Sequence, residues 1–277
     1  MALVYQRFTH VSVNRAESDV RLNINFMDSQ REDNLSLLLN SSDFTVKEAR
    51  GETPRNPSGI MGERDLKGLQ GKRMYLKSSQ GIREALMGMP KEERSHFFQL
   101  LVAGIANMVQ AEVFLLPERG FAAPAEYEKF FQNQYEGGCI FYANLDRVKR
   151  DFMAYVEANH KGRGQDSLFS RHSTATVRVA PGNERFLVRS NLSDSFHEMA
   201  IKLLVDSDTT ILASRVSILR VPDPVCSESA SQFPEVEGKK LSSGNIRELV
   251  GIAAGPRGCA HLGELLVEGA RALEKVV

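Results

Sequence analysis

The sequence repeats its own pattern, and this repeat limits the folds that the chain can adopt. Asn25-Phe-Met-Asp28-Ser matches Asn191-Leu-Ser-Asp194-Ser, and Leu35-Ser-Leu-Leu-Leu-Asn40 follows the first block as Ile201-Lys-Leu-Leu-Val-Asp206 follows the second, without a gap. Two later blocks keep the same order, with Gly81-Ile-Arg-Glu84 matching Asn245-Ile-Arg-Glu248 and Ser95-His-Phe97 matching Ala260-His-Leu262. Several blocks in one order at nearly one spacing favour a duplicated domain. The alternative is two unrelated α+β domains with similar patterning.

Each half shows the same succession of strand and helix signals. Alternating or short apolar runs separated by turn residues predict an antiparallel meander of four strands: Phe8–Val13, Val20–Phe26, Leu35–Leu39 and Phe44–Ala49, then Ser173–Val179, Arg185–Ser190, Met199–Val205 and Thr210–Val216. Apolar residues at helical spacing predict that Glu92–Gln110 and His261–Lys275 close the two halves as helices. Strands followed by helices indicate an α+β fold, in which C-terminal helices pack on an antiparallel sheet in each half.

An aromatic-rich segment separates the two halves. Nine of the 21 Phe and Tyr residues fall between Pro117 and Asn159. A helix is expected from Pro124, a break at Gly137-Gly138 and a second helix with Asn144 as its N-cap. These aromatic residues either line a pocket for a planar ligand or hold two domains together. We therefore expect three parts: residues 1–116, an insertion at 117–165 that ends in the polar linker His160–Asp166, and residues 166–277.

Composition excludes some partners. The 35 basic residues balance the 35 acidic ones, so we expect neither nucleic acid nor a membrane surface as the main partner. Three cysteines are too few for a disulfide framework, and no apolar run is expected to reach the roughly 18 residues of a spanning helix. These features predict a cytoplasmic protein, either a monomeric pseudo-dimer or a homodimer.

Side chains that can bind metal gather in the second half. His197 precedes a predicted strand, Cys226 lies in a proline-rich loop, and Cys259 with His261 begins the last predicted helix. Two thiolates and two imidazoles are a donor set for zinc or iron, and a helix N-terminus favours the thiolate form of a cysteine. The alternative is that the cysteines are buried apolar residues and the histidines make ordinary hydrogen bonds.

The matching positions of the first half differ. Arg31 stands opposite His197 and Arg94 opposite Cys259, while His96 stands opposite His261. One copy keeps metal donors and the other offers cationic side chains. We therefore predict Arg31, Arg94, His96 and the recurring Arg247 as ligand-binding residues, because arginines can clamp a carboxylate through two hydrogen bonds.

The second half resembles a bacterial domain family of unknown function. Members combine an Asp before a His-x-Met strand, an Arg-x-Pro...Cys loop and a closing Gly-Cys-Thr-His-Leu motif, which correspond here to Asp194, His197-Glu-Met199, Arg220-Val-Pro222...Cys226 and Gly258-Cys259-Ala-His261-Leu262. Alanine replaces the usual threonine. The first half shares Leu69-Gln-Gly71 and Ile82-Arg-Glu84 with the family and lacks its cysteines.

The order of the donors is also similar in architecture to iron-sulfur scaffold proteins of the NifU/IscU type. That resemblance implies a metal or nucleophilic-sulfur site at the end of the sheet. The first hypothesis is a metal-binding protein. With an open coordination position it would be a metal-dependent enzyme that acts on a small carboxylate- or carbonyl-containing molecule held between the halves. The alternative is a non-enzymatic ligand-binding or accessory module with a structural metal or none.

Overall fold

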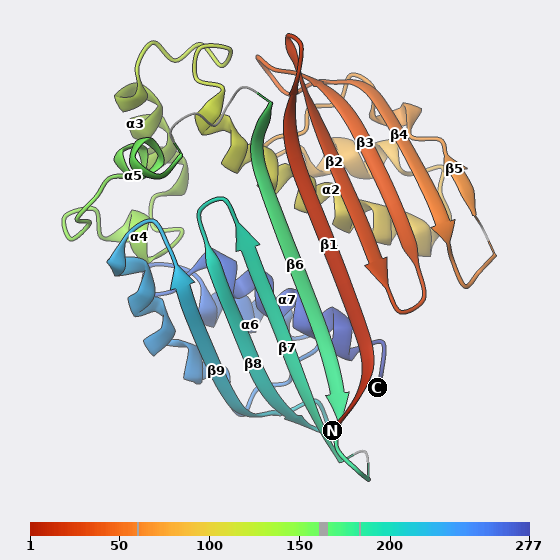
Figure 1. Ribbon diagram of the computed structural model, residues 1–277. Helices are drawn as coiled ribbons and strands as arrows, with labels where there is room; N and C mark the ends of the chain where they lie inside the picture. The colour runs from red at the N-terminus through yellow and green to blue at the C-terminus, as the bar shows by residue number, and fades with distance from the viewer. Residues whose placement is uncertain (60, 161–165, 183) are drawn as a thin grey trace. The chain divides into compact units, whose positions relative to one another are not determined.

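The computed structural model describes residues 1–59, 61–160, 166–182 and 184–277, which fold into two compact units (Figure 1). The N-terminal unit comprises Thr9–Tyr127 and His160–His172. The C-terminal unit comprises Met1–Phe8, Glu128–Asn159 and Ser173–Val277. The predicted linker at His160–Asp166 lies largely outside the described residues.

The N-terminal unit is an antiparallel sheet with its helices packed on one face. Its strands β1 (Ala2–Ala16), β2 (Asp19–Asp28), β3 (Glu32–Asn40), β4 (Val46–Arg55) and β5 (Gly62–Arg64) are neighbours in chain order, and β1 begins in the other unit. The helical elements are η1 (Lys67–Leu69), α1 (Ser79–Ala85), α2 (Lys91–Ala111) and η2 (Glu112–Phe114).

Helix α2 packs on the sheet of this unit through an apolar face. Phe97, Leu101 and Met108 on α2 and Leu22 and Ile24 on β2 are fully buried. The packing is close because Gly104 has no side chain: a Cβ atom there would lie 2.8 Å from Ile24 Cδ1 and 3.0 Å from Leu22 Cδ2. The stretch Lys91–Phe114 is long and apolar enough to cross a membrane by length and composition, contrary to the prediction, but 56% of its most apolar 18-residue part is buried. Core packing explains its apolar composition.

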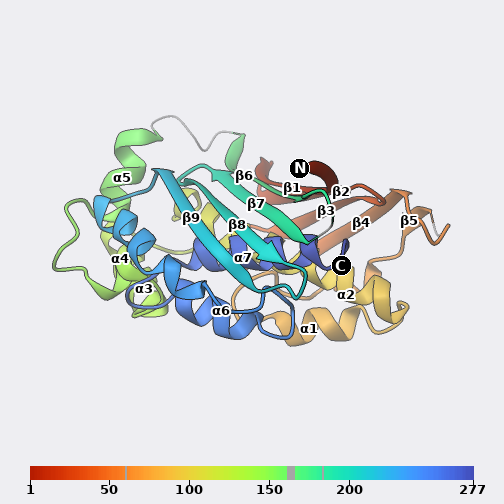
Figure 2. The ribbon, with the colours of Figure 1, turned by 90° about the horizontal axis from the view of Figure 1, so that it is seen from below.

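The C-terminal unit has the same strand-then-helix order. Strands β6 (Ser167–Val179), β7 (Arg185–Asp194), β8 (Glu198–Asp206) and β9 (Ile211–Arg220) are neighbours in chain order, and β6 begins in the other unit. The 3-10 helices η3 (Pro224–Ser231) and η4 (Phe233–Val236) follow, then α6 (Ile246–Ala253) and α7 (Ala260–Leu273). Both α6 and α7 lie on one side of β7–β9 (Figure 2). The expected α+β architecture with antiparallel strands is confirmed.

The strand geometry of the two units agrees in detail. Asp19 pairs with Asn40 as Arg185 pairs with Asp206, and both hairpins continue in that register over their length. Register shifts fall at matching places, between Leu38 and Leu39 in β3 and between Leu204 and Val205 in β8. The turns that follow contain Phe44 (φ 62°) and Thr209 (φ 65°), two matching residues in a conformation that non-glycine residues rarely adopt.

The helix-to-sheet contact also recurs. Gly269 on α7 faces β7 as Gly104 faces β2, since a Cβ on Gly269 would lie 3.1 Å from Ser190 Oγ and 3.2 Å from Val188 Cγ1. Val188 and Ser190 occupy the register positions of Leu22 and Ile24.

The aromatic insertion is helical, as expected, but its second helix begins elsewhere. It contains α3 (Pro124–Tyr135), the short α4 (Ile140–Ala143) and α5 (Phe152–Asn159). The prediction that Asn144 is an N-cap is wrong: Asn144 ends α4, and its amide nitrogen donates to the carbonyls of Ile140 (2.7 Å) and Pro256 (3.3 Å). Its side chain therefore holds α4 against the segment before α7 instead of starting a helix.

Candidate functional site

The turn between β7 and β8 brings Asp194 and His197 together in the C-terminal unit. Asp194 Oδ1 accepts hydrogen bonds from the backbone nitrogens of Phe196 (2.7 Å) and His197 (2.6 Å) and lies 3.2 Å from His197 Nδ1. The Asp194 backbone nitrogen donates to the His197 carbonyl (2.8 Å), which closes the turn. Aspartate often forms such turns because its short side chain reaches the backbone two or three residues ahead.

Arg220 at the end of β9 clamps this turn from outside. Its guanidinium donates to the backbone carbonyls of Ser195 (2.9 Å), Asp194 (2.8 Å) and His197 (3.3 Å). A planar guanidinium presents several donors in a fixed arrangement. Arg220 therefore fixes the backbone that carries His197.

His261 completes a three-residue cluster. It lies in the first turn of α7, and its ring centroid is 4.0 Å from that of His197. One potential ligand atom from each of Asp194, His197 and His261 lies within 4.8 Å of the other two. Asp194 and His197 are buried, whereas His261 is half-buried. Two imidazoles and one carboxylate at such spacing are a recurrent donor set for zinc and for non-haem iron.

Cysteines adjoin the imidazole-carboxylate cluster. Cys259 Sγ lies 3.8 Å from His261 Nδ1, and Cys259 is the N-cap residue of α7. Burial raises the pKa of the Cys259 thiol to about 12, although backbone hydrogen bonds at Leu262 and His261 oppose the shift. Burial likewise raises the pKa of Cys226, and the nearby Cys259 adds to that rise. Without a cation beside them, both thiols stay protonated at neutral pH.

The predicted metal ligands therefore separate into two adjoining groups. His197 and His261 are brought together with Asp194, whereas Cys226 on η3 neighbours Cys259 and Cys139. Cys139 reaches this place because the nitrogen of Ile140 donates to the Gly258 carbonyl (2.8 Å). Sequence reasoning did not assign Asp194 or Cys139 as donors. The signal for Asp194 was its place three residues before His197, where an aspartate closes a turn.

The aromatic insertion packs on the site from the same unit. Phe152 and Phe196 meet edge to face with their centroids 5.1 Å apart, and Tyr155 Oη donates to the Phe196 carbonyl (3.2 Å). Phe131 stacks on Tyr135 at 4.5 Å. The aromatic side chains pack on one another and on the residue before His197, so they support the turn that carries Asp194 and His197.

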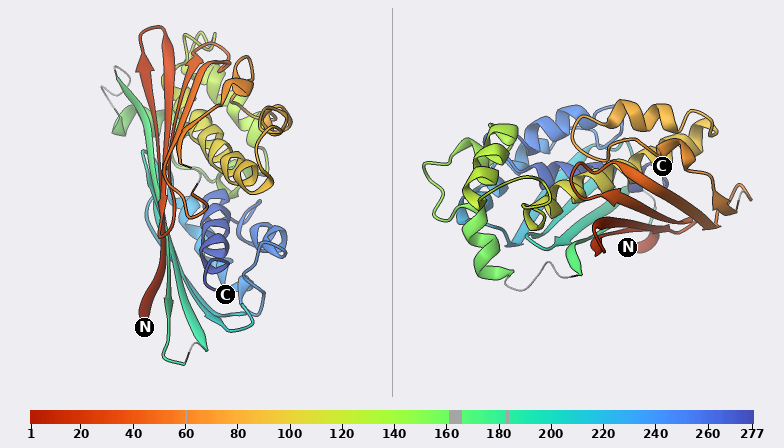
Figure 3. Two further views of the ribbon diagram at one scale, coloured as in Figure 1. Left: turned by 90° about the vertical axis from the view of Figure 1, so that its right-hand side faces the viewer. Right: turned by 90° about the horizontal axis from the view of Figure 1, so that it is seen from above.

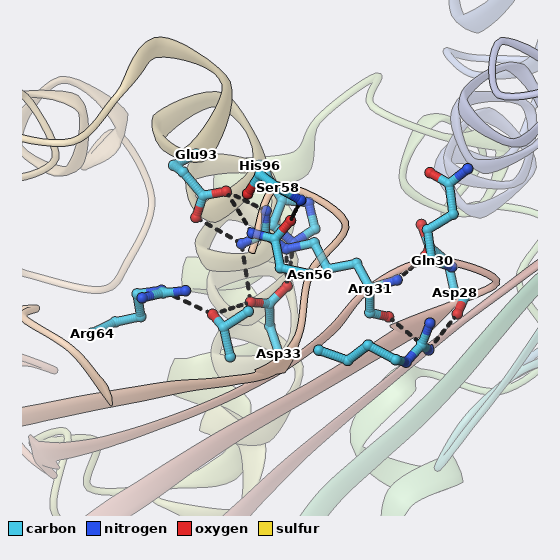
Figure 4. A network of polar contacts seen from close by, with 11 residues as sticks. Asp28, Gln30, Arg31, Asp33, Asn56, Ser58, Arg64, Glu93 and His96 are labelled. Atoms are coloured by element: carbon cyan, nitrogen blue, oxygen red, sulfur yellow. Dashed lines mark hydrogen bonds and ion pairs between the residues drawn. The ribbon is translucent and has the colours of Figure 1, made fainter. Parts of the chain in front are cut away.

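The matching turn of the N-terminal unit carries an internal cation (Figure 4). Asp28 Oδ1 accepts from the backbone nitrogens of Gln30 (2.7 Å) and Arg31 (2.6 Å), and Arg55 donates to the Asp28 carbonyl (2.8 Å), as Arg220 does at Asp194. Arg31, at the position of His197, binds Asp33 (Nε to Oδ2, 2.5 Å) and Glu93 (Nη2 to Oε2, 2.8 Å). The turn is the same in both units, but a guanidinium replaces an imidazole.

His96 belongs to the same ionic network. Its Nε2 lies 2.8 Å from Asp33 Oδ2, and Thr53 Oγ1 donates to Asp33 Oδ1 (2.6 Å). Burial opposes ionisation of Asp33, but hydrogen bonds from His96, Arg31 and Thr53 outweigh it and lower its pKa to about 2. Burial also opposes the charge of Arg31, yet its bonds to Glu93 and Asp33 raise the pKa of that guanidinium.

The four residues predicted to bind a ligand lie in different surroundings. Arg31 and His96 are both engaged by Asp33. Arg94 directs Nη1 toward Met87 Sδ (3.5 Å), and Arg247 is exposed on α6 of the other unit. A ligand role for these residues stays a prediction.

Comparison with known protein families gives a match for one part of the chain. Residues 178–274 match a family model described as "Protein of unknown function (DUF2889)". The matched range includes all four predicted metal ligands and Asp194. No curated protein matches the chain. The architectural resemblance to NifU/IscU-type scaffold proteins stays a prediction.

Proposed function

We propose that the C-terminal unit binds one divalent transition-metal ion, zinc or iron, through His197, His261 and Asp194. The observation that carries this proposal is the convergence of two imidazole nitrogens and a carboxylate oxygen within 4.8 Å. The carboxylate near His197 Nδ1 also favours the tautomer with its proton on that nitrogen, which leaves the Nε2 lone pair for a ligand bond.

Comparison of the two turns supports a cation at this place. In the N-terminal unit the guanidinium of Arg31 supplies a permanent positive charge between two carboxylates. In the C-terminal unit His197 offers an imidazole nitrogen at the matching position. A site built from neutral imidazoles can accept a metal ion, whereas a guanidinium excludes one. The same turn thus holds its own cation in one unit and is suited to an external cation in the other.

The number of protein ligands decides what the metal does. Three ligands leave a coordination position open, and an ion held in that way supplies Lewis-acid chemistry or an activated water at neutral pH. The half-buried position of His261 favours this form, which suits a small carboxylate- or carbonyl-containing substrate. If Cys259 is a fourth ligand, the closed site instead acts as a structural staple of the unit.

We further infer that the two units descend from one duplicated domain and that only the C-terminal copy keeps the metal donors. The shared hairpin register, the matching register shifts, the paired Phe44 and Thr209 turns and the two glycine contacts support this inference. A cytoplasmic location accords with the three free cysteines.

Metal analysis of the full chain tests the proposal. We expect about one zinc or iron ion per chain, and we expect His197→Ala and His261→Ala each to weaken binding at least 100-fold. His96→Ala is the matched control, because His96 occupies the position of His261 in the unit with the internal cation. A wild-type chain that binds neither metal, or equal losses in all three variants, would refute the site.

Cobalt substitution then separates the open from the closed form. A thiolate ligand gives a sulfur-to-cobalt charge-transfer band in the near ultraviolet, whereas an imidazole-carboxylate site does not. We expect no such band from the open site. A band that disappears in Cys259→Ser would show a fourth ligand and favour the structural role.

A further inference from the structure

The open face of the N-terminal unit carries a groove of about 1020 Å³. Helices α1 and α2 lie on the other side of β2–β4 (Figure 3), so these two helices leave this face uncovered. A volume of this size lies at the upper end of the range for ligand sites. The uncharged polar residues that line the groove come from three adjacent strands: Ser12, Asn23, Asn25, Asn34 and Ser36.

These side chains form an amide lattice, in which the spacing along a strand equals the spacing of alternate residues in an extended polypeptide. Asn25 lies directly opposite Asn34, and Asn23 lies opposite Ser36. Directly opposed residues place their Cβ atoms about 5 Å apart, and alternate residues on one strand are about 6.8 Å apart. The same distance separates alternate residues of any extended chain. A peptide lying along β2 would therefore meet a polar side chain at every second residue.

The asparagine amides are available for such contacts. In the part of the chain that the structure describes, the side chains of Asn23, Asn25 and Asn34 are half-buried and make no hydrogen bond to protein. A primary amide has a carbonyl acceptor and an N–H donor side by side, which complement the N–H and C=O groups of one residue in an extended chain, because these two groups point to the same side. Each asparagine can thus bind one peptide residue through two hydrogen bonds.

The charges around the groove do not select a charged ligand. Among its described lining residues, three are basic and three acidic: Arg50, Arg64 and Lys67, and Glu52, Glu63 and Asp65. This balance gives no attraction for a polyanion. The described lining also contains no aromatic ring on which a sugar or a base could stack. A neutral backbone is the occupant that these side chains fit.

The amide lattice is a feature of the N-terminal unit alone. The register positions of Asn23, Asn34 and Ser36 are filled in the C-terminal unit by Arg189, Ala200 and Lys202. Asn191 keeps the position of Asn25, but its Nδ2 donates to Thr174 Oγ1 (3.0 Å). The unit without the imidazole cluster thus carries the unpaired amides.

We propose that this groove binds an extended polypeptide segment, whose backbone amides bond to Asn23, Asn25 and Asn34. Binding of this kind depends on backbone geometry and tolerates many side-chain sequences. It is independent of the metal site, which lies in the other unit.

Selection from a phage-displayed library of random peptides of about twelve residues tests the proposal, with the full-length chain as bait. We expect enriched peptides, and a synthetic copy should bind Asn25→Ala/Asn34→Ala at least tenfold more weakly than wild type. Asn191→Ala is the matched control and should bind as wild type does. Circular dichroism melts will show that each variant is folded.

Backbone N-methylation of the peptide provides the second measurement. Methylation should abolish binding at every second residue and be tolerated between, because only alternate residues direct their N–H and C=O groups toward the asparagines. Failure to enrich any peptide, equal binding by the double variant, or methyl sensitivity without a period of two would overturn the proposal. Loss of oligosaccharide binding in the same variants, without peptide enrichment, would overturn it too.

Discussion

One side chain distinguishes the turn between β2 and β3 from the matching turn between β7 and β8. Asp28 and Asp194 accept the same two backbone hydrogen bonds, and Arg55 and Arg220 clamp the same carbonyls. The difference lies three residues after each aspartate, where Arg31 or His197 projects toward the start of the long helix. Because the surrounding backbone is the same, the side chain at this position determines whether the turn presents a guanidinium or an imidazole.

Asp33 should make the protein sensitive to acid. Its pKa is about 2 in the folded chain against an ordinary 3.8, so its ionised form stabilises the fold at pH values above 3.8. That contribution, about 2 kcal/mol, is lost progressively as the pH falls through the folded pKa. Asp33→Asn lacks the contribution, so the difference in unfolding free energy between wild type and variant should shrink between pH 5 and about pH 2.

Urea unfolding over that pH range measures the effect. Wild type should lose stability faster than Asp33→Asn as the solution is acidified. Parallel pH profiles for the two proteins would contradict the ion-pair network drawn in Figure 4.

At the level of elements, the strands and long helices were predictable because their apolar residues follow the period of each structure. The strands predicted at 20–26, 35–39, 185–190 and 199–205 agree within a few residues with the bounds of β2, β3, β7 and β8. The prediction for Asn144 is wrong because asparagine serves equally at turns and at helix caps, and one of its two partners, the Pro256 carbonyl, is distant in the sequence. Tertiary contacts of this kind leave no local signal.

The close contacts at the helical glycines give a stability prediction for these elements. Gly104→Val places side-chain atoms where Leu22 and Ile24 already lie, and overpacking of this kind should cost about 1–3 kcal/mol. Gly251 is the matched control: it is exposed inside α6, and a Cβ there would have no atom within 4 Å. Gly251→Ala should stabilise the protein by about 0.5–1 kcal/mol through helix propensity.

Thermal or urea unfolding of both variants measures whether Gly104→Val lowers stability and Gly251→Ala raises it. A Gly104→Val protein as stable as wild type would show that α2 does not pack on β2 in the way described. Destabilisation by Gly251→Ala would contradict the open surroundings of that residue.

At the scale of the whole molecule, the two units share a framework and differ in the side chains at matching positions. The sequence could suggest His197 and His261 as ligands of one site, because both are metal-donor side chains of the same half. It could not show that Asp194 and His197 meet His261 or that Cys139 adjoins Cys226, since these contacts join segments far apart in the chain. The family match extends over residues 178–274, the part that holds the proposed metal ligands.

The most direct test of the metal site is anomalous diffraction from crystals of the full chain loaded with zinc. The account predicts an anomalous peak above the zinc edge at bonding distance, about 2.0–2.2 Å, from one imidazole nitrogen of His197, one of His261 and a carboxylate oxygen of Asp194. No peak should occur between Arg31 and His96 in the N-terminal unit. A zinc-loaded crystal without density at His197 and His261, or with its zinc held elsewhere in the chain, would contradict the central claim.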